Sequence, residues 1–344
     1  MNLIGEHVDY NGGRCLPMAL TQTTSARISL RDGDTHLVTS GGRRWEGTLE
    51  ELGEVGPDDA WVLYAAGVLV ALEVREGLAI EITSDVPVGA GLSSSAALEC
   101  SVAVGVDRLL GLGLSPEALV EAAVRAETET VGAPTGGLDQ SIAIHGEAAH
   151  ALLLDFASGA CEQVPFDPAG HGVALLVVDT LVSHTLTDGS YGSRRDEAWA
   201  AAEQLGLDKR GLAGAPSLDG LSGDSLRRAR HVVTEVARVD DFVAALKADD
   251  WDALGPLMDA SHASLRDDYE VSCEELDVAV DTAREAGASG ARMTGGGFGG
   301  SAIALVPVER VDAVESAVST AFAARGWRRP DFFIAEPGPG AHVA

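Results

Sequence analysis

From residue 87 to residue 97 the chain reads Pro87-Val88-Gly89-Ala90-Gly91-Leu92-Ser93-Ser94-Ser95-Ala96-Ala97. Residues 78–83 before it alternate like a strand, and residues 96–110 continue as a helix. Glycines between a strand and a helix let backbone N–H groups converge where the helix dipole favours an anion. The three serines add hydroxyl donors. This segment therefore predicts a phosphate-binding turn whose natural occupant is a triphosphate.

The same turn differs from the two commonest nucleotide-binding patterns. It has no lysine at the helix start, as GxxxxGK[ST] requires, and it does not match GxGxxG. A plain strand-to-helix turn capped by serines is the alternative interpretation.

Two further segments are rich in glycine. The first reads Asn2-Leu3-Ile4-Gly5-Glu6-His7-Val8-Asp9-Tyr10-Asn11-Gly12-Gly13, and the second reads Gly290-Ala291-Arg292-Met293-Thr294-Gly295-Gly296-Gly297-Phe298-Gly299-Gly300. In the first, two carboxylates and an imidazole stand within four residues, which suits a polyol that needs several fixed acceptors and a donor; a solvated turn is the alternative. The second is too glycine-rich for a helix or strand interior and indicates close backbone approach rather than a flexible linker.

Composition bounds the function classes. The 344 residues suit two lobes, and the mean hydropathy of +0.10 is typical of a globular protein. With 24 Lys and Arg against 53 Asp and Glu, the net charge of −29 excludes nucleic acid and anionic membranes as expected partners. The four scattered cysteines indicate neither a zinc site nor a disulfide scaffold, and no apolar run is long enough to span a membrane. We expect a cytoplasmic protein.

The remaining pattern predicts mixed helices and strands without a strict alternation, which favours an α+β fold over a doubly wound sheet. Ser115 followed by Pro116 and Glu117 predicts a helix start. Helices are expected at residues 61–75, 96–110, 116–129, 193–205, 226–237, 241–248, 274–286 and 308–325. Strands are expected at residues 78–83, 151–156, 173–179 and 331–335, and on both sides of the glycines at 295–300.

The three glycine-rich segments, in their order along the chain, resemble the three motifs of the GHMP kinase superfamily. The first segment, with the Leu16-Pro17 that follows it, is similar to the signature of galactokinases. The resemblance extends from residue 2 to residue 300, and residues 330–341 resemble the family's C-terminal strand and tail. It implies a two-lobed α+β molecule, with a ribosomal-protein-like lobe at residues 1–180, a ferredoxin-like lobe at residues 181–344, and ATP and sugar meeting in the cleft.

The resemblance also implies an activity: transfer of the γ-phosphoryl group of ATP to the anomeric hydroxyl of D-galactose, in galactose catabolism, by a monomer. The implied ATP-binding residues are Pro87, Gly89, Gly91, Leu92, Ser93, Ser94, Ser95 and Ala96. The implied galactose ligands are Glu6, His7 and Asp9, with Tyr191 closing over the sugar. A core residue is the alternative interpretation of Tyr191.

Gly136-Gly137-Leu138-Asp139-Gln140 resembles the family segment that carries the catalytic aspartate, so Asp139 is the expected proton acceptor. A helix N-terminal acid is its alternative role. Magnesium would be held by Ser95 and Glu127, since the spacing of Glu127 from Asp139 is similar to that of the family's metal-binding glutamate. Glu129 is the neighbouring acid that could be mistaken for it, and a solvated helical face is the alternative for both.

The sequence departs from the family at its start, where an arginine and a valine normally precede Asn2 and only Met1 stands here. Met1 stands where the family has the valine, and a valine codon can be read as a start, so we expect a mis-called N-terminus and a missing segment before it. The family's arginine would stabilise charge on the phosphoryl group or keep the aspartate ionised. Two other functions stay open. One is a catalytically impaired galactose and ATP sensor; the other is a kinase for a related sugar such as N-acetylgalactosamine, galacturonate or arabinose.

Overall fold

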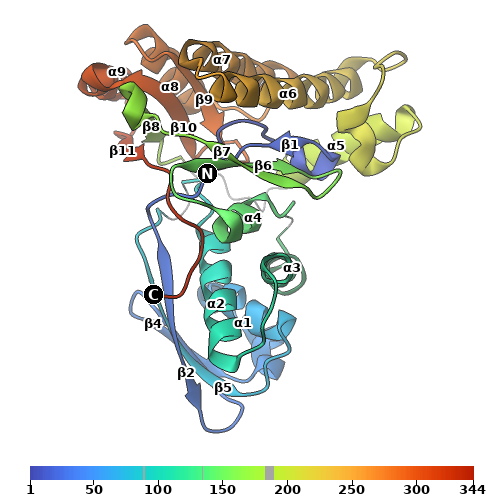
Figure 1. The fold of residues 1–344 in the computed structure, drawn as a ribbon, viewed down its shortest axis with the longest axis vertical. Coiled ribbons are helices and arrows are strands. Elements are labelled where there is room, and N and C mark those ends of the chain that lie inside the picture. The colour runs from blue at the N-terminus through green and yellow to red at the C-terminus, as the bar shows by residue number, and fades with distance from the viewer. Residues whose placement is uncertain (88–89, 134, 183–189) are drawn as a thin grey trace. The chain divides into compact units, whose positions relative to one another are not determined.

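The computed structural model describes residues 1–87, 90–133, 135–182 and 190–344 (Figure 1). The chain divides into two compact units. Unit 1 consists of Met1–Leu20, Val88–Leu92 and Glu147–Gly338, and unit 2 of Thr21–Pro87, Ser93–Gly146 and Pro339–Ala344. Both units mix helices and strands, as the sequence predicted. The division at residue 180 expected from the motif order stays a prediction.

Unit 2 is built on a four-stranded sheet with the order β2-β5-β3-β4, in which only the β3–β5 pair is parallel. Its strands are β2 (Thr24–Arg31), β3 (His36–Ser40), β4 (Arg43–Gly47) and β5 (Gly77–Ser84). Its helices are α1 (Val62–Ala71), α2 (Ser94–Leu110), α3 (Pro116–Arg125) and α4 (Leu138–His145). Leu78, Ile80 and Ile82 of β5 are buried in one core with residues of α1 and α2, because alternate strand residues share a face. Figure 1 shows α1 and α2 beside this sheet.

Unit 1 contains an antiparallel sheet with the order β11-β8-β10-β9 and a smaller sheet with the order β1-β6-β7. The strands are β1 (Arg14–Cys15), β6 (His150–Asp155), β7 (Cys161–Pro165), β8 (Val173–Asp179), β9 (Gly290–Thr294), β10 (Ser301–Pro307) and β11 (Asp331–Ala335). The helices are α5 (Ser190–Gln204), α6 (Gly223–Lys247), α7 (Leu254–Ser264), α8 (Glu274–Glu285) and α9 (Val311–Ala324). Residues 301–306 of β10 are all buried, which fits a central strand covered on both faces.

Most of the predicted elements are present. The helix expected after Ser115 begins at Pro116, and the Ser115 hydroxyl accepts the Ala118 N–H at 3.3 Å, as an N-cap should. The strands expected at residues 78–83, 151–156, 173–179 and 331–335 are β5, β6, β8 and β11.

The prediction of two helices at residues 226–237 and 241–248 is wrong, because both belong to the single helix α6. Asp240 and Asp241 favoured a break, since aspartate is a weak helix former. Val239, Phe242 and Val243 are all buried, so the apolar stripe continues past the two acids. Packing outweighs the local preference at this point.

Candidate active site

The segment expected to bind sugar is buried: the exposed fractions of Glu6, His7 and Asp9 are 6%, 5% and 8%. One oxygen of Glu6, Oε1, accepts the Gly295 N–H at 2.8 Å and the Thr294 hydroxyl at 3.2 Å. The segment at residues 295–300 is therefore no flexible linker, since it holds the orientation of the Glu6 carboxylate.

His7 is fixed at both ring nitrogens. Its Nε2 lies 3.2 Å from the Gly296 carbonyl oxygen, which can only accept, so Nε2 carries the proton. Its Nδ1 lies 2.8 Å from the Tyr10 hydroxyl, which then donates to it. Burial, together with the charge of His231, lowers the pKa of His7 to about 3, so the imidazole is neutral near pH 7.

Tyrosine rings surround His7. The Tyr191 ring lies 5.2 Å and the Tyr269 ring 4.9 Å from the imidazole, centroid to centroid. A Cβ on Gly296 would lie 3.3 Å from the Tyr191 ring, so a residue without a side chain suits this approach. The structure thus brings Tyr191 to the Glu6–Asp9 segment. Tyr269 was missed by sequence reasoning, because it is isolated in the sequence and 262 residues from His7.

Two side chains of helix α6 hydrogen-bond to the backbone of the Glu6–Asp9 segment and of Gly5 before it. Glu235 accepts the Gly5 N–H at 3.0 Å, and His231 Nε2 donates to the Glu6 carbonyl oxygen at 3.0 Å. Burial acts to raise the pKa of Glu235, but Arg292 and Arg238 outweigh it and hold the pKa at about 2. Sequence reasoning missed these two residues as well, although buried polar side chains four positions apart in a helix are a detectable signal.

The predicted phosphate turn has the backbone that such a turn needs. Gly91 (φ 71°) and Ser93 (φ 62°) are both left-handed, and α2 begins directly afterwards with no side-chain hydrogen bond at its N-cap in the described residues. Ala90 accepts the Ser301 hydroxyl at 2.7 Å. Leu92 and Ala96 are buried beside this turn. Gly89 lies outside the described residues; Pro87 precedes the turn, and Ser94 is the first residue of α2.

Four side chains form a polar cluster in unit 2. The Ser95 hydroxyl donates to Glu127 Oε1 at 3.1 Å, and Gln140 Nε2 donates to Glu127 Oε2 at 2.5 Å and to Glu99 Oε2 at 3.1 Å. Glu127 lies in a single π-helical turn, Ala126–Val131, a feature frequent at functional sites. The two expected metal ligands, Ser95 and Glu127, are thus in contact.

The neighbouring acid Glu129 is placed differently. It pairs with Arg125 at 3.5 Å, and its side chain is 63% exposed. Glu127 is therefore the acid of this turn that contacts Ser95.

Glu99 and Gln140 were missed by sequence reasoning, although both are fully buried. Burial, and then the nearby charge of Glu127, raises the pKa of Glu99 to about 9, so Glu99 is a neutral acid at pH 7. The pKa of Glu127 is also raised, first by burial and then by Asp139, against the hydrogen bond from Gln140.

Asp139 lies in the first turn of α4, whose N-cap is Gly137 with a φ of 88°. It is the neighbour of Gln140 in sequence. The predicted sugar-binding residues Glu6, His7, Asp9 and Tyr191 lie in unit 1, and Ser95, Glu127 and Asp139 lie in unit 2.

The donor set of Ser95 and Glu127 fits magnesium, which prefers hydroxyl, carboxylate and phosphate oxygens. The described residues contain no group of three or more His, Cys, Asp and Glu side chains that could hold a metal ion. A magnesium ion at Ser95 and Glu127 would consequently take most of its ligands from phosphate and water.

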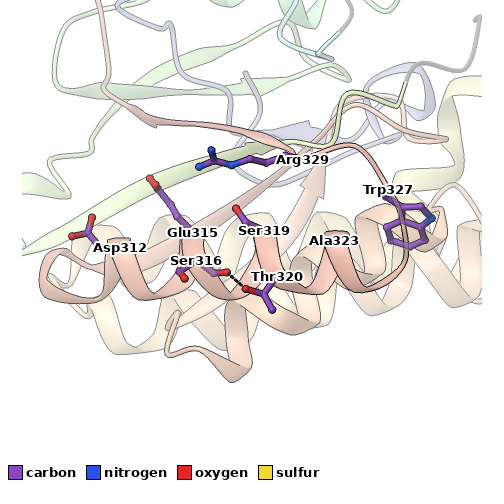
Figure 2. Close-up of a pocket in the computed structure, with 8 residues that line it drawn as sticks. All are labelled: Asp312, Glu315, Ser316, Ser319, Thr320, Ala323, Trp327 and Arg329. Atoms are coloured by element: carbon purple, nitrogen blue, oxygen red, sulfur yellow. Dashed lines mark hydrogen bonds between the residues drawn. The ribbon is translucent and has the colours of Figure 1, made fainter.

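A separate hollow of about 590 Å³ lies along α9 (Figure 2). It is lined by Asp312, Glu315, Ser316, Ser319, Thr320, Ala323, Trp327 and Arg329. None of these is a predicted site residue.

Among the described residues no helix is both long and apolar enough to cross a bilayer.

Comparisons with known proteins define the class. Residues 61–147 match the family model "GHMP kinases N terminal domain", and residues 242–324 match "GHMP kinases C terminal". The crystal structure of L. major mevalonate kinase in complex with R-mevalonate has a TM-score of 0.69 at 22% identity, covering 99% of this chain and 94% of that one. The fold and both domains are those of a GHMP kinase.

The first segment narrows this class. Residues 1–30 match the "Galactokinase galactose-binding signature". The galactokinase of Streptomyces coelicolor is 44% identical over 99% of this chain and 91% of its own length. That of Mycobacterium tuberculosis is 41% identical over 99% and 96%. The crystal structure of Lactococcus lactis galactokinase complexed with galactose has a TM-score of 0.90 at 33% identity, covering 100% of this chain and 92% of that one. The chain belongs to the galactokinase family.

Proposed function

We propose that this chain transfers the γ-phosphoryl group of ATP to the anomeric hydroxyl of D-galactose, giving α-D-galactose 1-phosphate and ADP. One observation carries the proposal: the galactose-binding signature coincides with a segment in which Glu6, His7 and Asp9 are buried and hydrogen bonds fix the side chains of Glu6 and His7. Fixed acceptors and donors in a small volume are what recognition of several sugar hydroxyls requires.

In the proposed reaction the sugar O1–Pγ bond forms as the bond between Pγ and the β,γ-bridging oxygen breaks. Asp139 accepts the proton of the sugar hydroxyl. The Glu6–Asp9 segment and Tyr191 hold the sugar. The backbone N–H groups of residues 91–96 and the Ser93 and Ser94 hydroxyls hold the phosphates, since the start of α2 lacks a side-chain cap in the described residues.

Magnesium belongs to this proposal as a partner of ATP, with Ser95 and Glu127 as the protein's ligands. The ion would neutralise charge on the phosphates. Its two protein ligands are in contact, and Gln140 fixes the second oxygen of Glu127. A cytoplasmic location and a monomeric state stay predictions.

The test is release of ADP from the purified chain with ATP and Mg²⁺, measured in a coupled assay with and without galactose. We expect release that depends on galactose. N-acetylgalactosamine, galacturonate and arabinose are assayed in parallel, because they differ from galactose around the second and sixth carbons. Turnover with one of these sugars and not with galactose would show that this sugar, and not galactose, is the substrate. Galactose binding without ADP release would favour a sensor.

A further inference from the structure

Gln140 lies between two acids of which only one is a proposed metal ligand. Its Nε2 donates to Glu127 Oε2 at 2.5 Å and to Glu99 Oε2 at 3.1 Å. Gln140 and Glu99 both have an exposed fraction of 0%. The two N–H bonds of one buried amide therefore connect Glu99 to Glu127.

This contact determines which way the Gln140 amide faces. A glutamine amide can rotate so that either its oxygen or its nitrogen faces a given neighbour. The Glu127 carboxylate oxygen Oε2 and Glu99 Oε2 both accept on one side, and only the nitrogen can donate to both. The amide oxygen then lies on the other side, 3.4 Å from the Thr135 hydroxyl that donates to it. Without Glu99, one buried N–H would lose its acceptor and the preference for this orientation would weaken.

The orientation of Gln140 in turn leaves one oxygen of Glu127 for a metal. Oε2 is occupied by the Gln140 N–H, while Oε1 faces Ser95, the other proposed ligand. Helix α2 places Ser95 and Glu99 four residues apart on one face, so one rigid element carries a proposed ligand and the end of the hydrogen-bond chain. Gln140 adjoins Asp139 in α4.

We propose that Glu99 and Gln140 are positioning residues of the magnesium–nucleotide site, with Glu99 orienting the Gln140 amide and Gln140 fixing the Glu127 carboxylate. This inference rests on the proposed function, because it takes Glu127 as a magnesium ligand. It predicts that both residues act on metal affinity without touching the metal. Removal of such partners of a metal ligand typically costs 10- to 100-fold in affinity or activity.

The experiment measures Mn²⁺ binding, from the electron paramagnetic resonance signal of free Mn²⁺, in the presence of the non-hydrolysable β,γ-imido analogue of ATP. Glu99→Leu removes the acceptor, and Gln140→Asn shortens the amide so that it no longer reaches both acids. We expect each to weaken Mn²⁺ binding by about 10-fold or more. Glu99→Gln keeps an oxygen that can accept the same N–H, so it should stay within about 3-fold of the wild type.

The control is Glu129→Gln, which alters an exposed acid in the same turn and should leave Mn²⁺ binding unchanged. Thermal unfolding of each variant separates a lost fold from a lost metal. If Glu99→Leu does not fold, Gln140→Asn and Glu99→Gln still decide. Wild-type Mn²⁺ affinity in folded Glu99→Leu or Gln140→Asn, or a loss in Glu99→Gln equal to that in Glu99→Leu, would overturn the inference.

Failure of the positioning roles can be distinguished from failure of the proposed kinase activity. A wild-type chain that binds Mn²⁺ with the ATP analogue but releases no ADP with any sugar contradicts the kinase activity and leaves the positioning roles to be measured by binding alone. Unchanged Mn²⁺ binding in Glu127→Gln would instead remove Glu127 as a ligand, and the inference with it.

Discussion

Buried histidines next to the sugar segment are neutral because of where they lie. His231 is fully buried, with Nε2 donating to the Glu6 carbonyl and Nδ1 2.9 Å from the Ser264 hydroxyl. Burial lowers the pKa of His231 to about 4 against the charge of Glu235, and the pKa of His7 is about 3. Below pH 6.5 the unfolded chain binds protons at these residues that the folded chain does not.

The folded chain should therefore lose stability as the pH falls from about 6.5 towards 4. For one histidine with the pKa of His231, the loss between pH 7 and pH 5 is roughly 2 kcal/mol. His231→Gln removes this share, so the variant's free energy of unfolding should fall less over the same interval. Urea unfolding of both proteins at pH 7 and pH 5 measures the difference. Equal losses in the two proteins would show that His231 does not titrate in this way.

Glu99 should make stability depend on pH in the opposite direction to the histidines. Its pKa of about 9 in the folded chain lies above its ordinary value of 4.5. Stability from the neutral acid is thus fully present below pH 4.5 and is lost as the pH rises towards 9. Glu99→Gln, which cannot ionise, should gain stability relative to the wild type between pH 5 and pH 8.5. Denaturant unfolding at these two pH values tests this, and a constant difference would contradict it.

Asp139 is the residue on which the proposed chemistry depends. Asp139→Asn keeps the shape but cannot accept a proton, so turnover should fall by about 10²- to 10⁴-fold. Affinity for the ATP analogue should change little, because the phosphates are held elsewhere. Glu121→Gln, an exposed acid on α3, is the matched control. Near-normal turnover in Asp139→Asn would remove it from this role.

At the scale of elements, α7 and β9 approach each other more closely than side chains allow. A Cβ on Gly255 would lie 2.0 Å from the Ser289 carbonyl oxygen, a backbone atom that cannot move aside. Gly255→Ala should therefore cost about 3 kcal/mol or more of unfolding free energy, through forced separation of the helix and the strand. Gly53→Ala, where a Cβ meets nothing within 4 Å, is the control. Urea unfolding of both variants measures the difference, and equal stability would contradict this packing.

The elements also show what could be predicted from the sequence. The start of α3, marked by Ser115 and Pro116, was predicted at the observed residue, whereas its predicted end at residue 129 falls within the π-helical turn Ala126–Val131. Strands β2, β3 and β4 were missed, since β2 has no fully buried residue and β4 consists largely of Arg43, Arg44, Trp45 and Glu46. Their pairing in the β2-β5-β3-β4 sheet depends on contacts across the fold rather than on local hydrophobic alternation.

The candidate site also contains residues that could be predicted from the sequence and residues that could not. Glu6, His7 and Asp9 stand together in the sequence, so their common role could be predicted. The residues that fix them and Glu127 come from distant segments: His231, Glu235 and Gly295 for the first group, and Gln140 for the second. Sequence spacing does not show which of these distant segments contact one another, although the glycines at residues 295–300 did indicate a close backbone approach.

At the scale of the whole molecule, the net charge of −29 dominates. Self-repulsion of this size destabilises a compact chain, and salt screens it with a Debye length of about 10 Å at 0.1 M. The melting temperature should therefore rise between 10 mM and 500 mM NaCl. Differential scanning calorimetry measures this, with sucrose at equal osmolality as a control for excluded-volume effects. A melting temperature that stays flat or falls with NaCl would show that specific ion pairs outweigh the net charge.

The way unit 1 is assembled has a consequence for how the chain leaves the ribosome. Residues 1–20 pack with partners such as Glu235 and Gly295, which are translated more than 200 residues later. At about 5–20 residues per second, the nascent Leu3, Ile4 and Val8 wait on the order of tens of seconds for their buried environment. During that interval they form an apolar segment that chaperones can hold, while unit 2 already has most of its own sequence available for folding.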